Sequence, residues 1–198
     1  MNCRHCAKKF EHLFLDLGLA PLSNAYITKE DLHKPELIYP LRVMVCNRCW
    51  LVQTEDFINA SDMFTADYAY FSSTSTSWLA HSIQYYQMIC RQLSLNENSF
   101  VIEIASNDGY LLKNFVQAGI PCLGIEPANN TADVAEKLGV TVKNEFFCEK
   151  LAKELATIGK KADLIIGNNV YAHVPDINNF TRGLKKVLKT KQKSTKRT

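Results

Sequence analysis

The sequence lacks the features of an exported or membrane-inserted chain. No apolar run approaches the roughly 20 residues needed to span a bilayer, and the first ten residues are polar and include two cysteines, unlike a signal peptide. These absences predict a cytoplasmic protein without a membrane partner. The first turn after the main apolar strand also lacks the G-x-G-x-x-G phosphate loop, and this absence argues against an NAD-binding protein.

Acidic residues are absent from residues 184–198, which contain seven lysines and arginines. The chain has 198 residues and a net charge of +3, and without these seven cations the charge becomes −4. A basic end can contact nucleic acid or an anionic membrane, but a solvated, disordered end explains the same composition. We therefore predict a disordered basic tail over 190–198.

Four of the seven cysteines occur in two identical spacings, Cys3-Arg-His-Cys6 and Cys46-Asn-Arg-Cys49. Two such knuckles supply the four thiolates of a closed, structural zinc site, which leaves no position for a catalytic water. Disulfides would require secretion, and a redox pair would need only one motif. His5 is a minor candidate ligand, and the other three cysteines are interpreted as core or incidental thiols.

The first domain is predicted over 1–65 and a connector over 66–97. Turn signals occur at Gly18, Pro21, Pro35 and Pro40, a strand is expected over 41–45, and a hairpin continues after Trp50. The connector should hold a helix over 78–93 that is capped by Thr76 or Ser77. Its Ser/Thr-rich start is either a plain loop or a segment that directs Tyr68 and Tyr70 into a pocket between the domains.

Residues 100–126 are the most informative part of the chain. An apolar strand over 100–104 is followed by the polar turn 106–109, a helix that ends at Gly119, and a second strand that ends at Glu126. Glu126 follows Asn107 by 19 residues, a spacing at which a doubly wound sheet binds a ribose. The pattern predicts binding of a nucleoside-like cofactor.

Two further strand–helix units follow in the predicted domain over 98–189, and four such units imply a parallel sheet in an α/β fold. We expect a helix over 130–138, a weak strand over 140–142, a helix over 149–158, a strand over 162–167 and a helix over 177–188. The loops after the strands gather at one edge of the sheet, and they contain Phe146, Phe147 and residues 168–173. His173 is there either a general base or substrate donor, or a packed core histidine.

The ordered motifs resemble a known family. They are the two Cys-x-x-Cys pairs, Tyr68–Ser75, Ile104–Gly109, Gly124–Pro127 and Asn169–Asp176. In this order they resemble the S-adenosylmethionine-dependent C-methyltransferases with an N-terminal zinc-binding domain, which include enzymes that methylate C-3 of nucleotide-linked deoxy-keto-sugars. The resemblance covers residues 1–188 and implies a Rossmann-like methyltransferase sheet, a structural zinc ion, and a nucleotide-sugar substrate.

Site residues follow from the resemblance position by position. Cys3, Cys6, Cys46 and Cys49 correspond to the zinc ligands. The residues expected to bind the cofactor are Glu103, Ala105, Ser106, Asn107, Asp108, Gly109, Glu126, Pro127, Phe146, Phe147, Asn168 and Asn169. His173 and one of Tyr68 and Tyr70 are expected to face the sugar. Ala105 stands where the family usually has glycine, and its methyl group fits only if the backbone needs no positive φ.

The resemblance also implies that relatives are about twice as long and complete the sugar pocket with later strands and a C-terminal domain. We expect a truncated product with strand order 3-2-1-4, an apolar edge at the fourth strand, weak cofactor binding and little turnover. A separate chain is a candidate source of the missing half. The alternative is a non-enzymatic zinc-ribbon module that binds nucleic acid or protein. The negative charge of the body and the position of Glu126 argue against nucleic acid.

Overall fold

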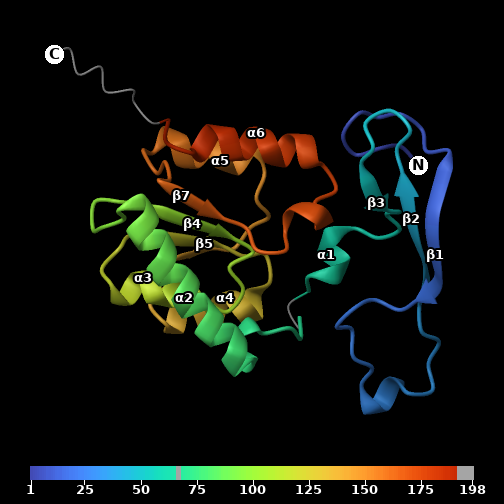
Figure 1. Cartoon of the computed structure of the whole chain (residues 1–198). Coiled ribbons are helices and arrows are strands. Elements are labelled where there is room, and N and C mark those ends of the chain that lie inside the picture. The colour runs from blue at the N-terminus through green and yellow to red at the C-terminus, as the bar shows by residue number, and fades with distance from the viewer. Residues whose placement is uncertain (66–67, 191–198) are drawn as a thin grey trace.

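The structure is a computed structural model that describes residues 1–65 and 68–190. It contains a small antiparallel sheet near the N-terminus and a larger parallel sheet flanked by helices (Figure 1). None of the helices in these residues is long and apolar enough to cross a bilayer. The predicted basic tail lies, from residue 191 onward, outside the described residues, as do Ala66 and Asp67 of the predicted connector. The predicted domain boundaries remain predictions.

The first sheet has the order β1-β2-β3, formed by β1 (His12–Ala20), β2 (Tyr39–Val45) and β3 (Val52–Thr54). β1 was not expected, and the assignment of Gly18 and Pro40 to turns was wrong, because both lie in strands. Gly18 has φ +80° where the β1–β2 register shifts, and its N–H donates to Asp16 Oδ1 at 2.8 Å. The glycine therefore permits a bulge in a strand that continues on either side.

The buried core of this first unit is small. It consists of Cys3, Phe10 and Cys46, with Met44 and Leu51 partly buried against it. The four leucines of β1 remain more than two-fifths exposed, as do Phe14 in the same strand and Trp50 before β3. Three buried side chains are a weak hydrophobic core for a sheet, so its stability must come largely from what the cysteines bind.

The second unit is an α/β domain whose parallel sheet has the order β6-β5-β4-β7, which confirms the predicted order 3-2-1-4. Its strands are β4 (Val101–Ile104), β5 (Cys122–Ile125), β6 (Val142–Lys143) and β7 (Leu164–Ile166). β6 begins two residues later than expected. β7 lies at one edge of the sheet. Just before β7 begins, Ala162 forms a single parallel bridge with Leu188, which follows α6.

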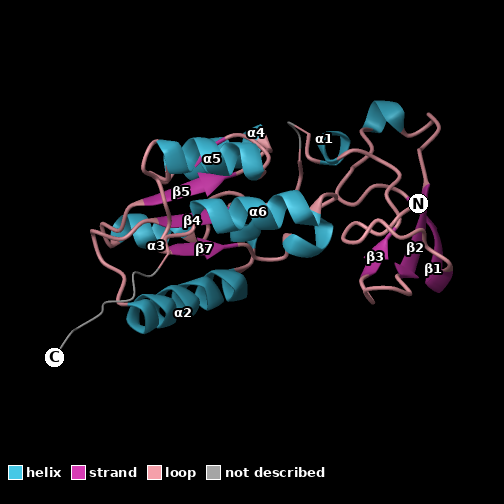
Figure 2. Cartoon of the chain, turned by 90° about the horizontal axis from the view of Figure 1, so that it is seen from above, coloured by secondary structure: helices cyan, strands magenta, loops and turns pink. Residues whose placement is uncertain are grey.

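Helices cover both faces of this sheet (Figure 2). One face is covered by α5 (Glu149–Thr157) and α6 (Ile177–Val187), and the other by α2 (Thr76–Leu93), α3 (Leu112–Gln117) and α4 (Asn129–Lys137). Ser75, rather than Thr76 or Ser77, caps α2 by accepting from the Trp78 N–H at 3.2 Å. Short helices are α1 (Ala60–Met63), η1 (Lys29–Asp31), η2 (Ser72–Thr74) and η3 (Tyr171–His173).

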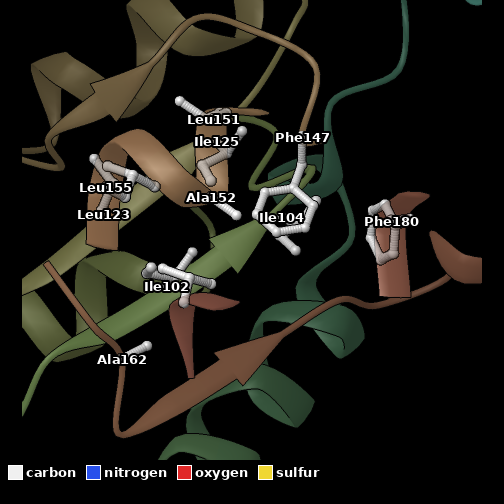
Figure 3. Packing of buried hydrophobic residues seen from close by; sticks show 11 residues of the cluster. Ile102, Ile104, Leu123, Ile125, Phe147, Leu151, Ala152, Leu155, Ala162 and Phe180 are labelled. Carbon is white, nitrogen blue, oxygen red and sulfur yellow. The ribbon is translucent and has the colours of Figure 1, made fainter. Parts of the chain in front are cut away.

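Alternation along β4 divides the core into two layers. Ile102 and Ile104 face α5 and α6, where Phe147 and Phe180 pack edge to face with ring centroids 5.0 Å apart (Figure 3). Val101 and Glu103 face the opposite layer, which also contains Phe115. Because the helices cover both faces, the loops at the carboxyl ends of the strands are left as the place for a ligand.

Candidate functional site

The turn after β4 is shaped by three residues with positive φ: Ala105 (+53°), Asn107 (+51°) and Gly109 (+75°). At Gly109 a Cβ atom would stand 3.0 Å from the Ala135 side chain, so glycine is needed both for the backbone angle and for the approach of α4. The turn thus brings its backbone N–H groups to the end of the sheet, close to β5.

The condition that the sequence set for Ala105, a backbone without a positive φ, is not met. Its backbone is left-handed, and its N–H donates to the Ile125 carbonyl at 2.8 Å, which ties the strained residue to β5. The side chain is exposed, so the methyl group has space, and the cost is conformational rather than a clash.

Glu126 joins the two loops. Its Oε2 accepts from the Asn107 N–H and its Oε1 from the Ala128 N–H, both at 2.9 Å. The residue is only 4% exposed. Burial raises the pKa of its carboxyl above the usual range, although the two backbone N–H groups oppose the shift. Each carboxylate oxygen has a second lone pair, so the group can still accept from a ligand hydroxyl.

Two more acidic side chains are buried nearby and incompletely paired. Neither oxygen of Glu103 and only one oxygen of Asp108 has a hydrogen-bond partner in the described residues. Burial raises the pKa of Glu103 well above its ordinary value; the nearby Tyr110 hydroxyl opposes this shift, and the charges of Glu126 and Asp108 add to it. Within the described residues no ion pair involves any of the three acids. A cofactor with a sulfonium and an ammonium group fits such a cluster, because it brings the missing positive charge.

The side chains of Asn107 and Asp108 bind the connector. Asn107 Oδ1 accepts from the Ser72 N–H at 2.8 Å, and its Nδ2 donates to the Tyr70 carbonyl at 3.0 Å. Asp108 Oδ2 accepts from the Ser73 N–H at 2.9 Å. These three hydrogen bonds hold residues 70–73 of the connector beside the turn. The sequence predicts both residues in the cofactor-binding turn, but it does not indicate that their side chains bind the segment that covers the turn.

The two predicted tyrosines lie on this covering segment. Tyr68 is partly buried, its ring centroid lies 5.2 Å from that of Phe64, and its carbonyl accepts from Asn130 Nδ2 at 2.7 Å. Burial raises the pKa of its hydroxyl, and the nearby Glu126 charge adds to this. Tyr70 is half exposed. Asn130 was missed, since an asparagine in the first turn of a helix resembles an ordinary capping residue.

The remaining predicted residues divide between the interior and the edge of the sheet. Phe147 belongs to the core, whereas Phe146 is 44% exposed and faces Phe64 with ring centroids 6.3 Å apart, so only Phe146 is accessible to an adenine. Ser106 is also interior, since it is fully buried. Pro127 is partly buried beside Glu126.

The loop after β7 contains the acceptor-side candidates. Asn168 Nδ2 donates to the Tyr110 hydroxyl at 3.0 Å, and Asn169 is exposed with φ +53°. His173 is exposed, and its backbone N–H donates to the Val170 carbonyl at 2.9 Å. The core interpretation of His173 is therefore wrong, because its side chain is not packed in the interior.

The four predicted metal ligands come together. The Sγ atoms of Cys3, Cys6, Cys46 and Cys49 all lie within 4.8 Å of one another, and two of the pairs are 3.5 Å apart. Sulfurs about 2.3 Å from one zinc ion in a tetrahedron have similar separations. The backbone N–H groups of Cys49 and Arg48 lower the pKa of Cys46 to about 6, which favours its thiolate. Although the Leu51 N–H opposes the shift, burial and the neighbouring thiols raise the pKa of Cys49 to about 12, so four thiolates need a cation between them. His5 is not a member of this cluster; its Nδ1 lies 2.9 Å from Asn178 Oδ1.

Comparison with known proteins matches both units. A family model described as "Putative zinc binding domain" matches residues 3–64, and one described as "Methyltransferase domain" matches residues 102–193. C-methyltransferase NovU of Streptomyces niveus is 32% identical over 187 residues, which are 94% of this chain and 44% of that protein. Ubiquinone biosynthesis O-methyltransferase of Bartonella quintana (strain Toulouse) is 30% identical over 96 residues, covering 48% of this chain and 38% of that protein.

The chain therefore spans less than half the length of either curated relative. Among solved structures, magnesium protoporphyrin IX methyltransferase (ChlM) from Synechocystis PCC 6803 with bound SAM is 17% identical, with 57% of this chain and 56% of that chain covered and a TM-score of 0.42. A score of this size supports no conclusion about function.

Proposed function

The chain belongs to the S-adenosylmethionine-dependent methyltransferases with an N-terminal zinc-binding domain, and we propose that it takes part in methylating a carbon atom of a nucleotide-linked sugar. S-adenosylmethionine is its cofactor and zinc its structural metal. The observation that supports the proposal most strongly is the Glu126 carboxylate, held by the Asn107 and Ala128 N–H groups within a cluster of incompletely paired acids.

In this proposal Glu126 accepts hydrogen bonds from the ribose hydroxyls, and Phe146 packs against the adenine. The backbone of 105–109 surrounds the methionyl part of the cofactor. When bound, the cofactor supplies an electrophilic methyl group on a sulfonium centre. The acids Glu103 and Asp108 offset its positive charge and keep it oriented toward the loop after β7.

On the acceptor side, His173 faces the carbon that is methylated. A carbon next to a ketone must lose a proton before it can form the new bond, and a neutral imidazole can accept that proton. A hydroxyl of Tyr68 or Tyr70 donates to the oxygen that becomes negative. The electron pair left on carbon then forms the bond to the methyl group.

We further propose that this chain turns over slowly by itself. In the described residues β7 has no strand on its outer side, and a groove of about 360 Å³ opens there, lined partly by Ile104, Ile166, Phe180 and Leu184. A separate chain that adds strands to β7 would close this side of the acceptor pocket. Adding the second half of the Streptomyces niveus relative should then raise turnover, and no rise would contradict this point.

Calorimetry with S-adenosylmethionine and its demethylated product tests the cofactor site. We expect the zinc-loaded chain to bind both, and Glu126→Gln to weaken binding roughly tenfold, as for the loss of a charged hydrogen-bond acceptor. Glu136→Gln is a matched control, since Glu136 is exposed on α4. Absence of binding to the parent chain, or salt-dependent binding of DNA without cofactor, would overturn the proposal.

Transfer of a labelled methyl group tests the acceptor class. Nucleotide-linked keto-sugars should be labelled on carbon, and His173→Asn should reduce labelling without changing cofactor affinity. Label on oxygen, or equal labelling with a free sugar, would contradict the proposed substrate class.

A further inference from the structure

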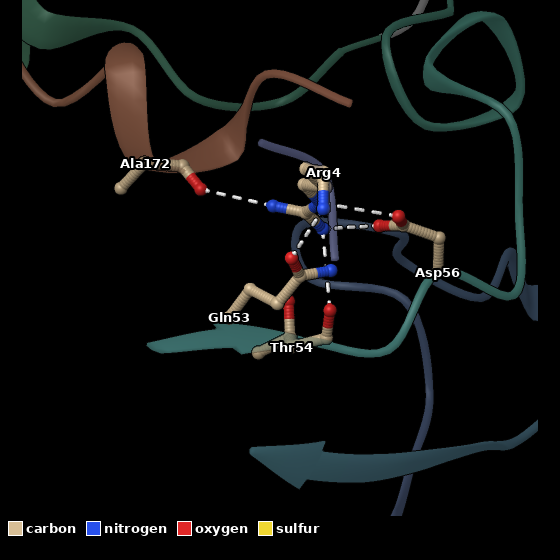
Figure 4. A network of polar contacts seen from close by, with 5 residues as sticks. All are labelled: Arg4, Gln53, Thr54, Asp56 and Ala172. Carbon is tan, nitrogen blue, oxygen red and sulfur yellow. Dashed lines mark hydrogen bonds and ion pairs between the residues drawn. The ribbon is translucent and has the colours of Figure 1, made fainter. Parts of the chain in front are cut away.

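Arg4 lies between the predicted zinc ligands Cys3 and Cys6, but its side chain contacts residues outside this turn. The side chain is only 7% exposed, and it forms an ion pair with Asp56, just after β3. Its Nε donates to Asp56 Oδ2 at 3.1 Å and its Nη2 to the Thr54 carbonyl at 3.3 Å (Figure 4). The guanidinium is therefore oriented by a carboxylate and a carbonyl of the zinc-binding unit.

The third contact of the guanidinium reaches the other unit. Nη1 donates to the carbonyl of Ala172 at 3.2 Å, in the short helix η3 whose last residue is His173 (Figure 4). Arg4 is the only hydrogen-bond donor to this carbonyl in the described part of the chain. The side chain thus joins the first knuckle to the loop that holds the proposed acceptor residue.

A second tie connects the same knuckle to the end of this loop. Asn178, in the first turn of α6, donates through Nδ2 to the His5 carbonyl at 2.8 Å, and its Oδ1 lies 2.9 Å from His5 Nδ1. On the opposite side, the Tyr171 hydroxyl lies 2.6 Å from Thr181 Oγ1. The loop is therefore held between α6 and the zinc-binding knuckle.

The backbone of the knuckle is fixed in turn by local contacts and by the cysteines. The Arg4 N–H donates to Gln53 Oε1 at 2.9 Å, and the Ala7 N–H donates to the Cys3 carbonyl at 3.0 Å. A metal held by Cys3 and Cys6 would lock the turn from which Arg4 projects. Without the metal, the small core of this unit leaves the turn poorly restrained.

We propose that Arg4 is a positioning residue that holds the His173 loop through the Ala172 carbonyl, so that the structural zinc site determines the geometry of the acceptor side. The role of His173 rests on the proposed function, whereas the physical tie between the metal site and the loop does not.

Hydrogen exchange on the zinc-loaded full chain tests the tie without cofactor or substrate. Arg4→Gln should speed exchange of the His173 and Val174 amides roughly tenfold, as expected for the loss of a charged hydrogen bond, and leave the β4 and β5 amides unchanged. Arg42→Gln is the matched control, because Arg42 pairs with Glu55 inside the zinc-binding unit and does not reach the loop. Zinc content is measured for each variant.

If Arg4→Gln loses its zinc, Asn178→Ala tests whether the knuckle holds the loop through the second tie, at His5, and it should also speed exchange of these amides. A loop unchanged in both variants, or exchange accelerated equally across the whole parallel sheet, would overturn the proposal.

With an active preparation, Arg4→Lys and Arg4→Gln should raise the KM for the acceptor while the cofactor affinity stays within about twofold of the parent. Failure of methyl transfer alone would count against the proposed function and not against the tie.

Discussion

At the scale of single residues, Ala105 is under conformational strain that a glycine would not have. Its φ of +53° costs an L-residue about 1–2 kcal/mol, and the greater freedom of glycine in the unfolded chain offsets part of this. We expect Ala105→Gly to raise the free energy of unfolding by about 0.5–1 kcal/mol, measured by urea denaturation of the zinc-loaded chain.

Ala118→Gly is the matched control, because Ala118 ends α3 with φ −87°. There the same change should lower stability by about 0.5–1 kcal/mol. Destabilisation by both changes would show that the turn after β4 does not hold Ala105 in the left-handed region.

Glu126 should make cofactor binding depend on pH. Burial raises the pKa of its carboxyl from 4.5, so ionisation is disfavoured in the folded chain, and this destabilises the fold as pH rises through the raised pKa. A cationic cofactor favours the carboxylate. Binding should therefore release protons, and affinity should increase as the pH rises through the raised pKa of Glu126.

Calorimetry in two buffers of different ionisation enthalpy measures the released protons, with zinc content checked at the lower pH. Glu126→Gln should reduce the pH dependence, and the part that remains is expected from Glu103, whose pKa burial also raises. Affinity that falls as pH rises in the parent chain would contradict this assignment.

Individual residues were predictable where spacing alone determines their place. The two cysteine pairs and Glu126 fall where the sequence indicates, since a knuckle and a strand end fix them locally. The side chains of Asn107 and Asp108 were less predictable, because their partners are backbone atoms of 70–73, about 35 residues away. Spacing identifies the turn, and only packing determines which group binds which side chain.

At the scale of elements, β5 approaches the turn after β4 too closely for any side chain at Gly124. A Cβ atom there would lie 2.4 Å from Ser106 Oγ and 3.0 Å from Ser106 Cβ. Gly124→Ala should therefore lower the free energy of unfolding by about 1–3 kcal/mol, as for other overpacked sites. Thermal or urea denaturation measures this.

Adding Ser106→Gly removes both contacting atoms. The double variant should be more stable than the sum of the two single effects by about 1 kcal/mol or more. Additive effects would show that the two elements can separate without cost.

The elements of the parallel sheet were predictable because buried strands and amphipathic helices alternate clearly there. β1 was missed although Leu13, Leu15, Leu17 and Leu19 alternate along it with the period of a strand. Gly18 obscured this pattern, since a glycine within a strand signals a turn as readily as a bulge. The cap of α2 was misplaced by one or two residues within a run of serines and threonines, any of which can cap a helix.

At the scale of the whole molecule, the two units should differ in their dependence on metal. The first unit has three buried core residues, whereas the second has two extensive clusters. Cys46→Ser should release zinc and unfold the β1–β3 sheet while the parallel sheet remains folded, as followed by hydrogen exchange.

Cys90→Ser should retain zinc and the exchange pattern of the parent, because Cys90 packs against the second unit instead. Retention of β1–β3 protection in metal-free Cys46→Ser would show that the first unit is stable by other means.

The strand order and the two-unit plan were predictable because handedness and connection rules leave few topologies for strand–helix repeats. The contacts between the units were not. Arg4 and Ala172 are 168 residues apart, and no periodicity in the sequence relates them. A basic residue inside a knuckle looks like any solvated charge until the second unit is placed beside it.

The long separation between Arg4 and Ala172 has a consequence during synthesis. At a ribosomal rate of about 5–20 residues per second, roughly 10–30 s pass between emergence of the knuckle and emergence of its carbonyl partner. Throughout that interval only the small core of Cys3, Phe10 and Cys46 and the ion that the cysteines bind keep the nascent first unit folded. Early capture of the ion would keep this core closed, so zinc-starved cells should accumulate this polypeptide in the aggregated fraction.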